Sequence, residues 1–169
     1  IPGGFAEKEE GKHLEAEIVK MIHESRASKD RGPVIVGGNC LGVVSLPGNY
    51  DTFFIPKNKM DYGVLKPYAF ISQSGAFIIS KISKTLLSPC YSASIGNQMD
   101  LTFSDYLNYF VDSKDINTVA VYIEGFKELD GIRTARAVRA LKQKGKNVLI
   151  YKGGRSLEGM SAASGHTAS

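Results

Sequence analysis

The sequence predicts an α/β protein built on a parallel, doubly wound sheet. From Tyr68 onward, short apolar runs alternate with segments in which apolar residues recur at intervals of three and four. The runs are typical of buried strands, and the intervals are typical of amphipathic helices. Parallel strands are joined by right-handed helical crossovers, so this alternation favours a single sheet with helices on its faces.

Four strands and three helices are expected in this part of the chain. The strands are predicted at residues 69–71, 91–95, 118–123 and 147–151. One helix opens at Ser72–Ala76, a second carries Phe103, Leu107, Phe110 and Val111, and a third covers residues 131–143. We expect the flavodoxin-like strand order.

The first part of the chain has a different pattern. Residues 5–29 read as a helix, in which Leu14, Ile18, Met21 and Ile22 form an apolar face. His13 and His23 are then exposed helix positions. A buried strand is predicted at Val34–Val36, and the Pro- and Gly-punctuated residues 43–67 read as an irregular crossing between domains. We therefore expect a domain boundary near residue 60, with residues 61–169 forming a flavodoxin-like domain.

Composition narrows the class of protein. With 169 residues, 43% hydrophobic and 22% charged, the chain can bury a core of one ordinary or two small domains. The net charge of +4 is spread along the chain without a basic stripe, which argues against nucleic-acid binding but is compatible with a small polyanionic ligand.

The two cysteines favour a reducing compartment. Cys40 and Cys90 have neither metal-ligand spacing nor a dense disulfide pattern, so a reducing, cytoplasmic setting is expected, with no metal site. Neither a membrane span nor a signal peptide is apparent. Because Ile1–Gly4 does not begin with Met, the chain reads as a piece of a larger protein.

Polar segments follow each predicted strand of the sheet. They are Ser72–Ala76, Gly96–Asp100, Glu124–Gly125 and the stretch from Lys152 onward. Since the carboxyl ends of parallel strands lie at one edge of a sheet, these segments are expected to converge there.

Two of the glycine-containing turns are candidate ligand sites. Ser72, Ser74, Gly75 and Ala76 place hydroxyls and free amides at a helix start, which suits an anion but equally suits a simple N-cap. The glycines around Asn39 and Cys40, up to Gly42, allow close approach of a ligand or a tight turn. Cys40 is not expected to act as a nucleophile, because the sequence shows no neighbouring base that would lower the pKa of its thiol.

Two further residues suit phosphoryl chemistry. His166 lies among small residues, so a reactant can reach its imidazole, although most such histidines are ordinary surface residues. Glu124 directly follows a buried strand. A carboxylate there can fix an imidazole tautomer, although the pattern alone favours a solvated glutamate.

These motifs together resemble the nucleoside-diphosphate-forming acyl-CoA synthetases, whose best-known member is succinyl-CoA synthetase. The residues matching the family's phosphohistidine loop are Lys152, Gly154, Arg155, Gly159, Ala162, Ala163 and His166. The turn at Gly37–Gly42 is similar to a Gly-Pro-Asn-Cys-x-Gly loop, with Gly38 in place of proline, and Ser72–Ala76 is similar to the phosphate-binding turn. The segments around Glu124 and His166 look more like the ADP-forming acetate-type enzymes. That residues 1–60 end a Rossmann-like domain is implied only by this family resemblance.

The resemblance implies a reaction and a set of partners. Acyl-CoA, phosphate and ADP would give acid, CoA and ATP through an acyl phosphate and a phosphohistidine at His166, with Glu124 as the partner of the histidine. Asn39, Cys40 and Gly42 would lie near CoA. An ATP-grasp domain or subunit would bind ADP or ATP with Mg²⁺, in an oligomer, with no tightly bound metal or flavin in this chain.

Other functions remain open from the sequence. A succinyl-CoA synthetase-like ligase and a non-catalytic module that senses acyl-CoA are the main alternatives, and a flavin-binding or receiver domain is a weaker one. The piece alone is expected to be inactive in full turnover. The acyl group, the direction of flux and the choice of ADP or GDP cannot be read from these residues.

Overall fold

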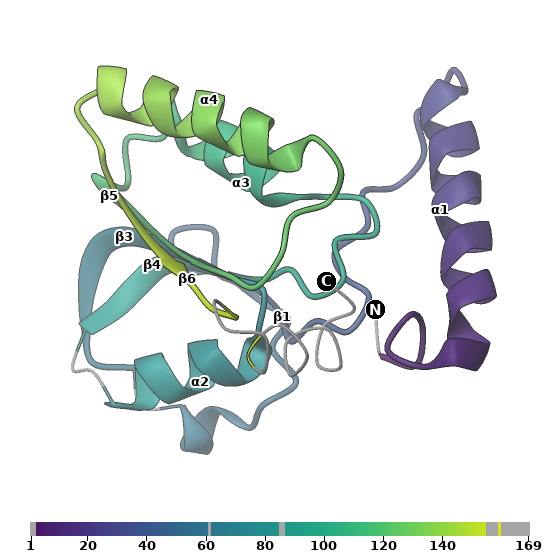
Figure 1. Ribbon diagram of the computed structural model, residues 1–169. Coiled ribbons are helices and arrows are strands. Elements are labelled where there is room, and N and C mark those ends of the chain that lie inside the picture. Colours follow the sequence, from purple (N-terminus) through teal and green to yellow (C-terminus); the bar gives the residue numbers. More distant parts are fainter. Residues whose placement is uncertain (1–2, 61, 85–86, 155–158, 160–169) are drawn as a thin grey trace.

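The computed structural model describes residues 3–60, 62–84, 87–154 and 159, and these form an α/β structure around one sheet (Figure 1). The sheet has six strands in the described residues, in the order β2-β1-β4-β3-β5-β6. Their bounds are β1 Gly42–Ser45, β2 Tyr50–Asp51, β3 Val64–Ser72, β4 Leu87–Ser94, β5 Thr118–Ile123 and β6 Asn147–Lys152.

The strands β3 to β6 confirm the predicted parallel sheet. β3 pairs in parallel with both β4 and β5, and β5 pairs in parallel with β6. The spatial order β4-β3-β5-β6 places the second parallel strand outside the first, as in flavodoxin-like sheets. β3 is longer than expected, and its register with β4 shifts between Lys66 and Ala69, around Pro67, which has no N–H to donate to the ladder.

Helices cover both faces of this sheet. Figure 1 shows α2 (Gly75–Lys84) on one face and both α3 (Phe103–Phe110) and α4 (Asp130–Gln143) on the other. Phe103, Leu107 and Leu141 from α3 and α4 are fully buried against Val119 of β5 and its neighbours. The three predicted helices are therefore confirmed, and the helix predicted from Phe103, Leu107 and Phe110 buries all three of these side chains.

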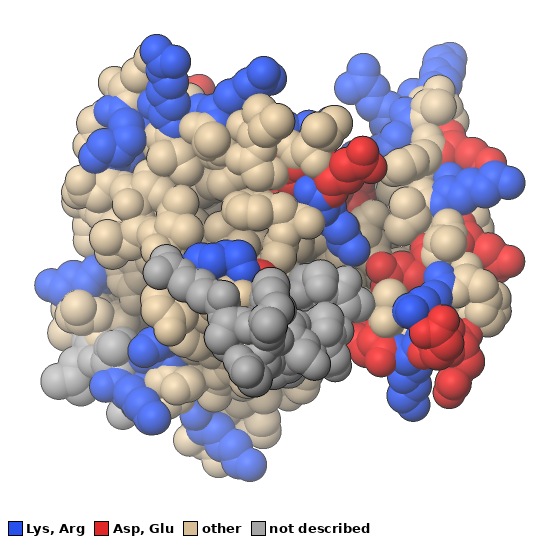
Figure 2. All heavy atoms as spheres, in the orientation of Figure 1, with Lys and Arg blue, Asp and Glu red and all other residues tan. Residues whose placement is uncertain are grey.

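The helix α1 (Lys12–Ala27), preceded by the short turn η1 (Glu9–Gly11), stands beside the sheet in Figure 1. It confirms the predicted N-terminal helix, with His13 and His23 exposed as expected. On the face drawn in Figure 2, acidic side chains gather over α1, whereas Lys and Arg lie in small, separate groups. None of the described helices is long and apolar enough to cross a membrane.

Two expectations about residues 34–67 were wrong. Val34–Val36 is not a strand; Val34 is 58% exposed, and the carbonyl groups of Ile35 and Gly37 accept bonds from the loop after β4 instead of from a strand. Conversely, the region predicted as irregular contains the β1–β2 hairpin and η2 (Lys57–Lys59).

The hairpin also matters for the division into domains. β1 pairs antiparallel with β4, so residues before position 60 extend the sheet of the second half. The boundary near residue 60, with a Rossmann-like part before it, stays a prediction.

Candidate active site

The carboxyl ends of β3 and β5 lie side by side at the point where the strand order reverses. Such a switch point is where open α/β sheets bind ligands, because the chain leaves adjacent strands toward opposite faces. Gln73, which follows β3 and is 1% exposed, spans the two strand ends. Its Oε1 accepts hydrogen bonds from the amides of Glu124 and Gly125, both at 2.9 Å. Two of the four predicted segments are thus joined directly.

The turn at Ser72–Ala76 combines the two roles that the sequence left open. Ser74 Oγ accepts a hydrogen bond from Phe77 N at 3.4 Å, as an N-cap of α2 does. Ser72 is fully buried, and its hydroxyl donates to the Ser74 carbonyl at 2.7 Å. Ser74, Gly75 and Ala76 line a cavity, so the positive end of α2 faces open space.

This cavity of about 370 Å³ has the Asn39–Cys40 loop as its opposite wall. Asn39, Cys40 and Leu41 line it together with Phe54 and Ile55. Gly42 opens β1 just behind, at a φ of 127°, where a Cβ would lie 2.6 Å from the Thr52 carbonyl oxygen. The candidate CoA loop and the candidate phosphate turn, far apart in sequence, therefore face each other across one cavity.

The loop after β4 holds the Asn39–Cys40 loop in place. The amides of Asn97 and Met99 donate to the carbonyls of Gly38 and Gly37, at 2.9 and 2.8 Å. Gly96, at a φ of 53°, packs so closely that a Cβ would lie 2.0 Å from the Gly38 carbonyl oxygen. This segment therefore supports the Asn39–Cys40 loop through backbone contacts.

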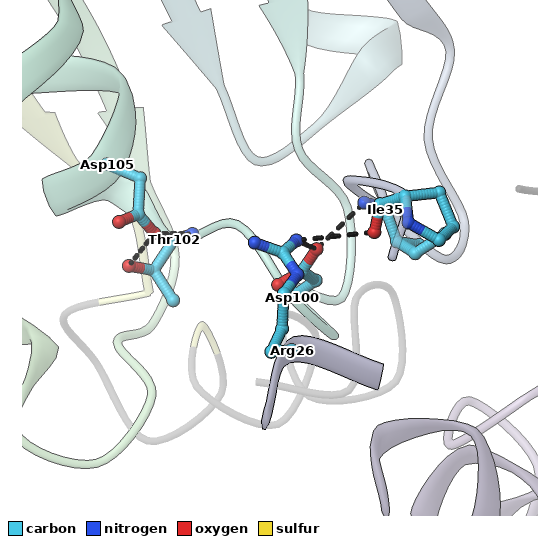
Figure 3. A network of polar contacts seen from close by, with 6 residues as sticks. Arg26, Ile35, Asp100, Thr102 and Asp105 are labelled. Carbon is cyan, nitrogen blue, oxygen red and sulfur yellow. Dashed lines mark hydrogen bonds and ion pairs between the residues drawn. The ribbon is translucent and has the colours of Figure 1, made fainter. Parts of the chain in front are cut away.

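Asp100 extends this contact to α1 (Figure 3). Its carboxylate accepts hydrogen bonds from Arg26 of α1 and from Ile35 N, the latter at 2.8 Å. Two residues on, Thr102 and Asp105 form the capping box that starts α3. The loop is therefore anchored to α1 at one end and to α3 at the other.

Glu124 lies directly after β5 and is only 9% exposed. Lys152 Nζ, at the end of β6, donates to the Glu124 carbonyl and to the Gly153 carbonyl, the second at 2.6 Å. Gln98 Nε2 donates to the Gly125 carbonyl at 3.2 Å. All four polar segments thus meet at this edge of the sheet, as the sequence predicts.

Tyr122 supports the Glu124 side chain. Its ring stacks on Phe77 and on Tyr151, with centroids at 4.0 and 5.7 Å, and those two rings also stack on each other at 6.0 Å. Burial, followed by the charge of Glu124 and a hydrogen bond to it, raises the pKa of the Tyr122 hydroxyl to about 12. The hydroxyl therefore keeps its proton at neutral pH and donates a hydrogen bond to the Glu124 carboxylate.

This pKa gives a test at alkaline pH. Since the pKa is raised from 10.0 to about 12 on folding, the stability contributed by the protonated hydroxyl is complete below pH 10 and is lost as pH rises toward 12. Between those values, we expect the difference in unfolding free energy between wild type and Tyr122→Phe to shrink. Urea unfolding at about pH 8 and about pH 11 measures it. A difference that stays constant would contradict the raised pKa of the Tyr122 hydroxyl. The pKa of Tyr91 is also raised to about 12, but Tyr91 is present in both proteins, so its contribution cancels in the difference.

Four of the residues matched to the phosphohistidine loop lie outside the described residues, namely Arg155, Ala162, Ala163 and His166. Lys152 and Gly154 are described and begin that loop at the same sheet edge. Gln73 and Gln98 were not predicted from the sequence, although a polar side chain between Ser72 and Ser74, after a buried strand, could have indicated the first.

The parallel strand order is that of a flavodoxin-like domain, and a helix start that lines a cavity at the switch point of such a sheet can attract a small anionic ligand. Comparison with known proteins agrees: residues 66–169 match the model of the succinyl-CoA ligase-like flavodoxin domain. The chain belongs to the NDP-forming acyl-CoA synthetases, in the family of the ADP-forming acetate–CoA ligase alpha subunits.

Individual relatives place the chain more closely. It is 36% and 35% identical to the alpha subunits of acetate–CoA ligases [ADP-forming] II and I of Pyrococcus furiosus, over its whole length and 35% of theirs. The acetyl-coenzyme A synthetase 1 of Candidatus Korarchaeum cryptofilum, solved with phosphate and ADP, superimposes with a TM-score of 0.80 and 28% identity, over 99% of this chain and 34% of that one. The chain thus spans about a third of the length of these relatives.

Proposed function

We propose that the chain is part of an ADP-forming acyl-CoA synthetase of the acetate type. The observation that carries this proposal is the cavity in which the Asn39–Cys40 loop faces the Ser74–Ala76 turn, with Glu124 tied to that turn through Gln73. A thioester and a phosphate bound on the two walls would be brought within reach of each other. The names of the Pyrococcus relatives support acetate-type chemistry.

The first step is attack of phosphate on the thioester carbonyl. A C–O bond forms, the C–S bond breaks, and CoA leaves as the thiolate and takes up a proton, which yields an acyl phosphate. The amides at the start of α2 and the dipole of that helix would attract the phosphate. Ser74, which caps the helix, lines the cavity beside the bound anion. Asn39 and Cys40 lie on the wall where the thioester end of CoA would be held.

The second step is transfer of the phosphoryl group to His166. An imidazole nitrogen attacks phosphorus, the P–O bond to the acyl group breaks, and the acid leaves as a carboxylate. Glu124 would accept a hydrogen bond from the other imidazole nitrogen and stabilise the positive charge that develops. The phosphohistidine would then pass its phosphoryl group to ADP.

The last transfer requires a partner. We infer that an ATP-grasp domain or a beta-type subunit binds ADP with Mg²⁺, which neutralises the phosphate charges, and that the whole assembles as an oligomer. Mg²⁺ in such sites is held by one or two carboxylates together with the phosphates of the nucleotide, so we assign it to the partner that binds ADP.

Phosphoryl labelling of the full-length protein with its nucleotide-binding partner tests this function. Radiolabelled ATP and Mg²⁺ are expected to give an acid-labile, base-stable label in wild type and none in His166→Asn. A folded wild type that binds CoA but takes up no label would contradict the proposal and favour a regulatory acyl-CoA sensor. Release of the label by a panel of acyl carboxylates identifies the acyl group and separates acetate-type from succinate-type ligases.

A further inference from the structure

The peptide of Glu124 is held from both of its ends by side chains of other segments. Its N–H donates to Gln73 Oε1 at 2.9 Å, and its carbonyl accepts from Lys152 Nζ. The neighbouring amide, Gly125 N, donates to the same Gln73 oxygen at 2.9 Å. One amide oxygen and one ammonium group therefore fix two successive peptide units at the end of β5.

Neither contact is needed to form the sheet. β5 and β6 are already paired from Thr118 and Asn147 up to Ile123 and Lys152, and β3 and β5 are paired up to Ser72 and Tyr122. Glu124 is the first residue beyond the β5 ladders, and the side chains of Gln73 and Lys152 bind its N–H and its carbonyl there. Their contacts thus determine the direction in which Glu124 leaves the sheet.

The electrostatics also favour a positioning role. Gln73 is 1% exposed, and Lys152 is partly buried, with carbonyl oxygens as the partners described for it. Burying an ammonium group against carbonyl groups is costly compared with leaving it in water. The same strand end could be satisfied by a neutral donor, so the placement of a charge here points to a role at the site.

We propose that Lys152 and Gln73 are positioning residues for Glu124, which orient its carboxylate toward the reacting imidazole. This inference rests on the proposed function and assigns a role to the lysine that begins the phosphohistidine loop. Because a displacement of about 1 Å at a reacting group can lower a rate about 100-fold, loss of either contact is expected to slow phosphoryl transfer.

The test is a double-mutant cycle in the full-length protein with its nucleotide-binding partner. The rate of His166 labelling is measured in single turnover for Lys152→Met, Glu124→Gln and the double variant. We expect Lys152→Met alone to lower the rate about 10- to 100-fold, and to lower it less than about 2-fold in the Glu124→Gln background, because Lys152 acts through Glu124.

Conservative variants and a stability control separate positioning from folding. Lys152→Arg retains N–H donors and Gln73→Glu retains the acceptor, so both should be faster than Lys152→Met and Gln73→Met. Val119→Ala, in the buried middle of β5, should lower the melting temperature without changing the labelling rate.

The outcomes are distinguishable. A labelled wild type in which Lys152→Met is as fast as wild type, or slows both backgrounds equally, overturns the inference and leaves the proposed function intact. A rate loss in Val119→Ala as large as that in Lys152→Met would show that stability alone sets the rate, and would also overturn the inference. A wild type without label overturns the proposed function and the inference together.

Discussion

Replacing Gly96 with alanine is expected to destabilise the folded protein by at least about 3 kcal/mol. The added Cβ would lie 2.0 Å from the Gly38 carbonyl oxygen and 2.5 Å from the Asn39 carbonyl oxygen, and both are backbone atoms of the facing loop. The φ of 53° adds strain for any residue with a side chain. Relief requires the Asn39–Cys40 loop to move away, so CoA binding should weaken as well.

Gly145 provides the matched control. It has a φ of 76°, yet nothing lies within 4 Å of the position that its Cβ would occupy. Gly145→Ala therefore has the conformational strain without the collision, and should cost only about 1 kcal/mol. Urea unfolding of both variants and CoA titration measure the two effects. Equal losses of stability in the two variants would show that the contact between the two loops carries no energy.

The sequence predicted the parallel part of the fold because that part depends on local patterns. The strand at 118–123 and the helix at 130–143 each contain an unbroken apolar periodicity, and their packing follows from it. β1 was missed because its pairing depends on β4, which lies about fifty residues further along the chain. Val34–Val36 was misread because an apolar run alone establishes neither burial nor pairing: Val34 is 58% exposed, and the Ile35 carbonyl accepts a bond from the loop after β4.

For the candidate site, the sequence predicted which segments lie together but not the contacts between them. Residues that follow strands converge at one sheet edge, so the segments around Ser74, Glu124 and Lys152 could be placed together. The contacts among them could not, because Gln73 reaches Glu124 only through the tertiary adjacency of β3 and β5. The ion pair of Arg26 with Asp100 likewise joins residues that no local pattern connects.

The second large effect is expected for Glu124→Gln, which should lower the rate of His166 labelling about 10²- to 10⁴-fold. Glutamine has the same shape, and the backbone at this position is held by Gln73 and Lys152, so the fold should be preserved. What is lost is the negative charge that fixes the imidazole tautomer and stabilises the cation formed in the transfer.

Glu128→Gln removes the same charge four residues away, at an exposed position, and should label at the wild-type rate. Single-turnover labelling and CoA titration are made on both variants. A Glu124→Gln protein that keeps the wild-type rate would show that another group stabilises the imidazolium. If labelling falls while CoA binding is retained, the loss lies in phosphoryl transfer, because the CoA site that we propose at Asn39 and Cys40 does not include Glu124. The two steps of the reaction would then take place at different residues. The thioester would be attacked at the Asn39–Cys40 loop, and the phosphoryl group would be transferred at the sheet edge where Ser74 and Glu124 lie.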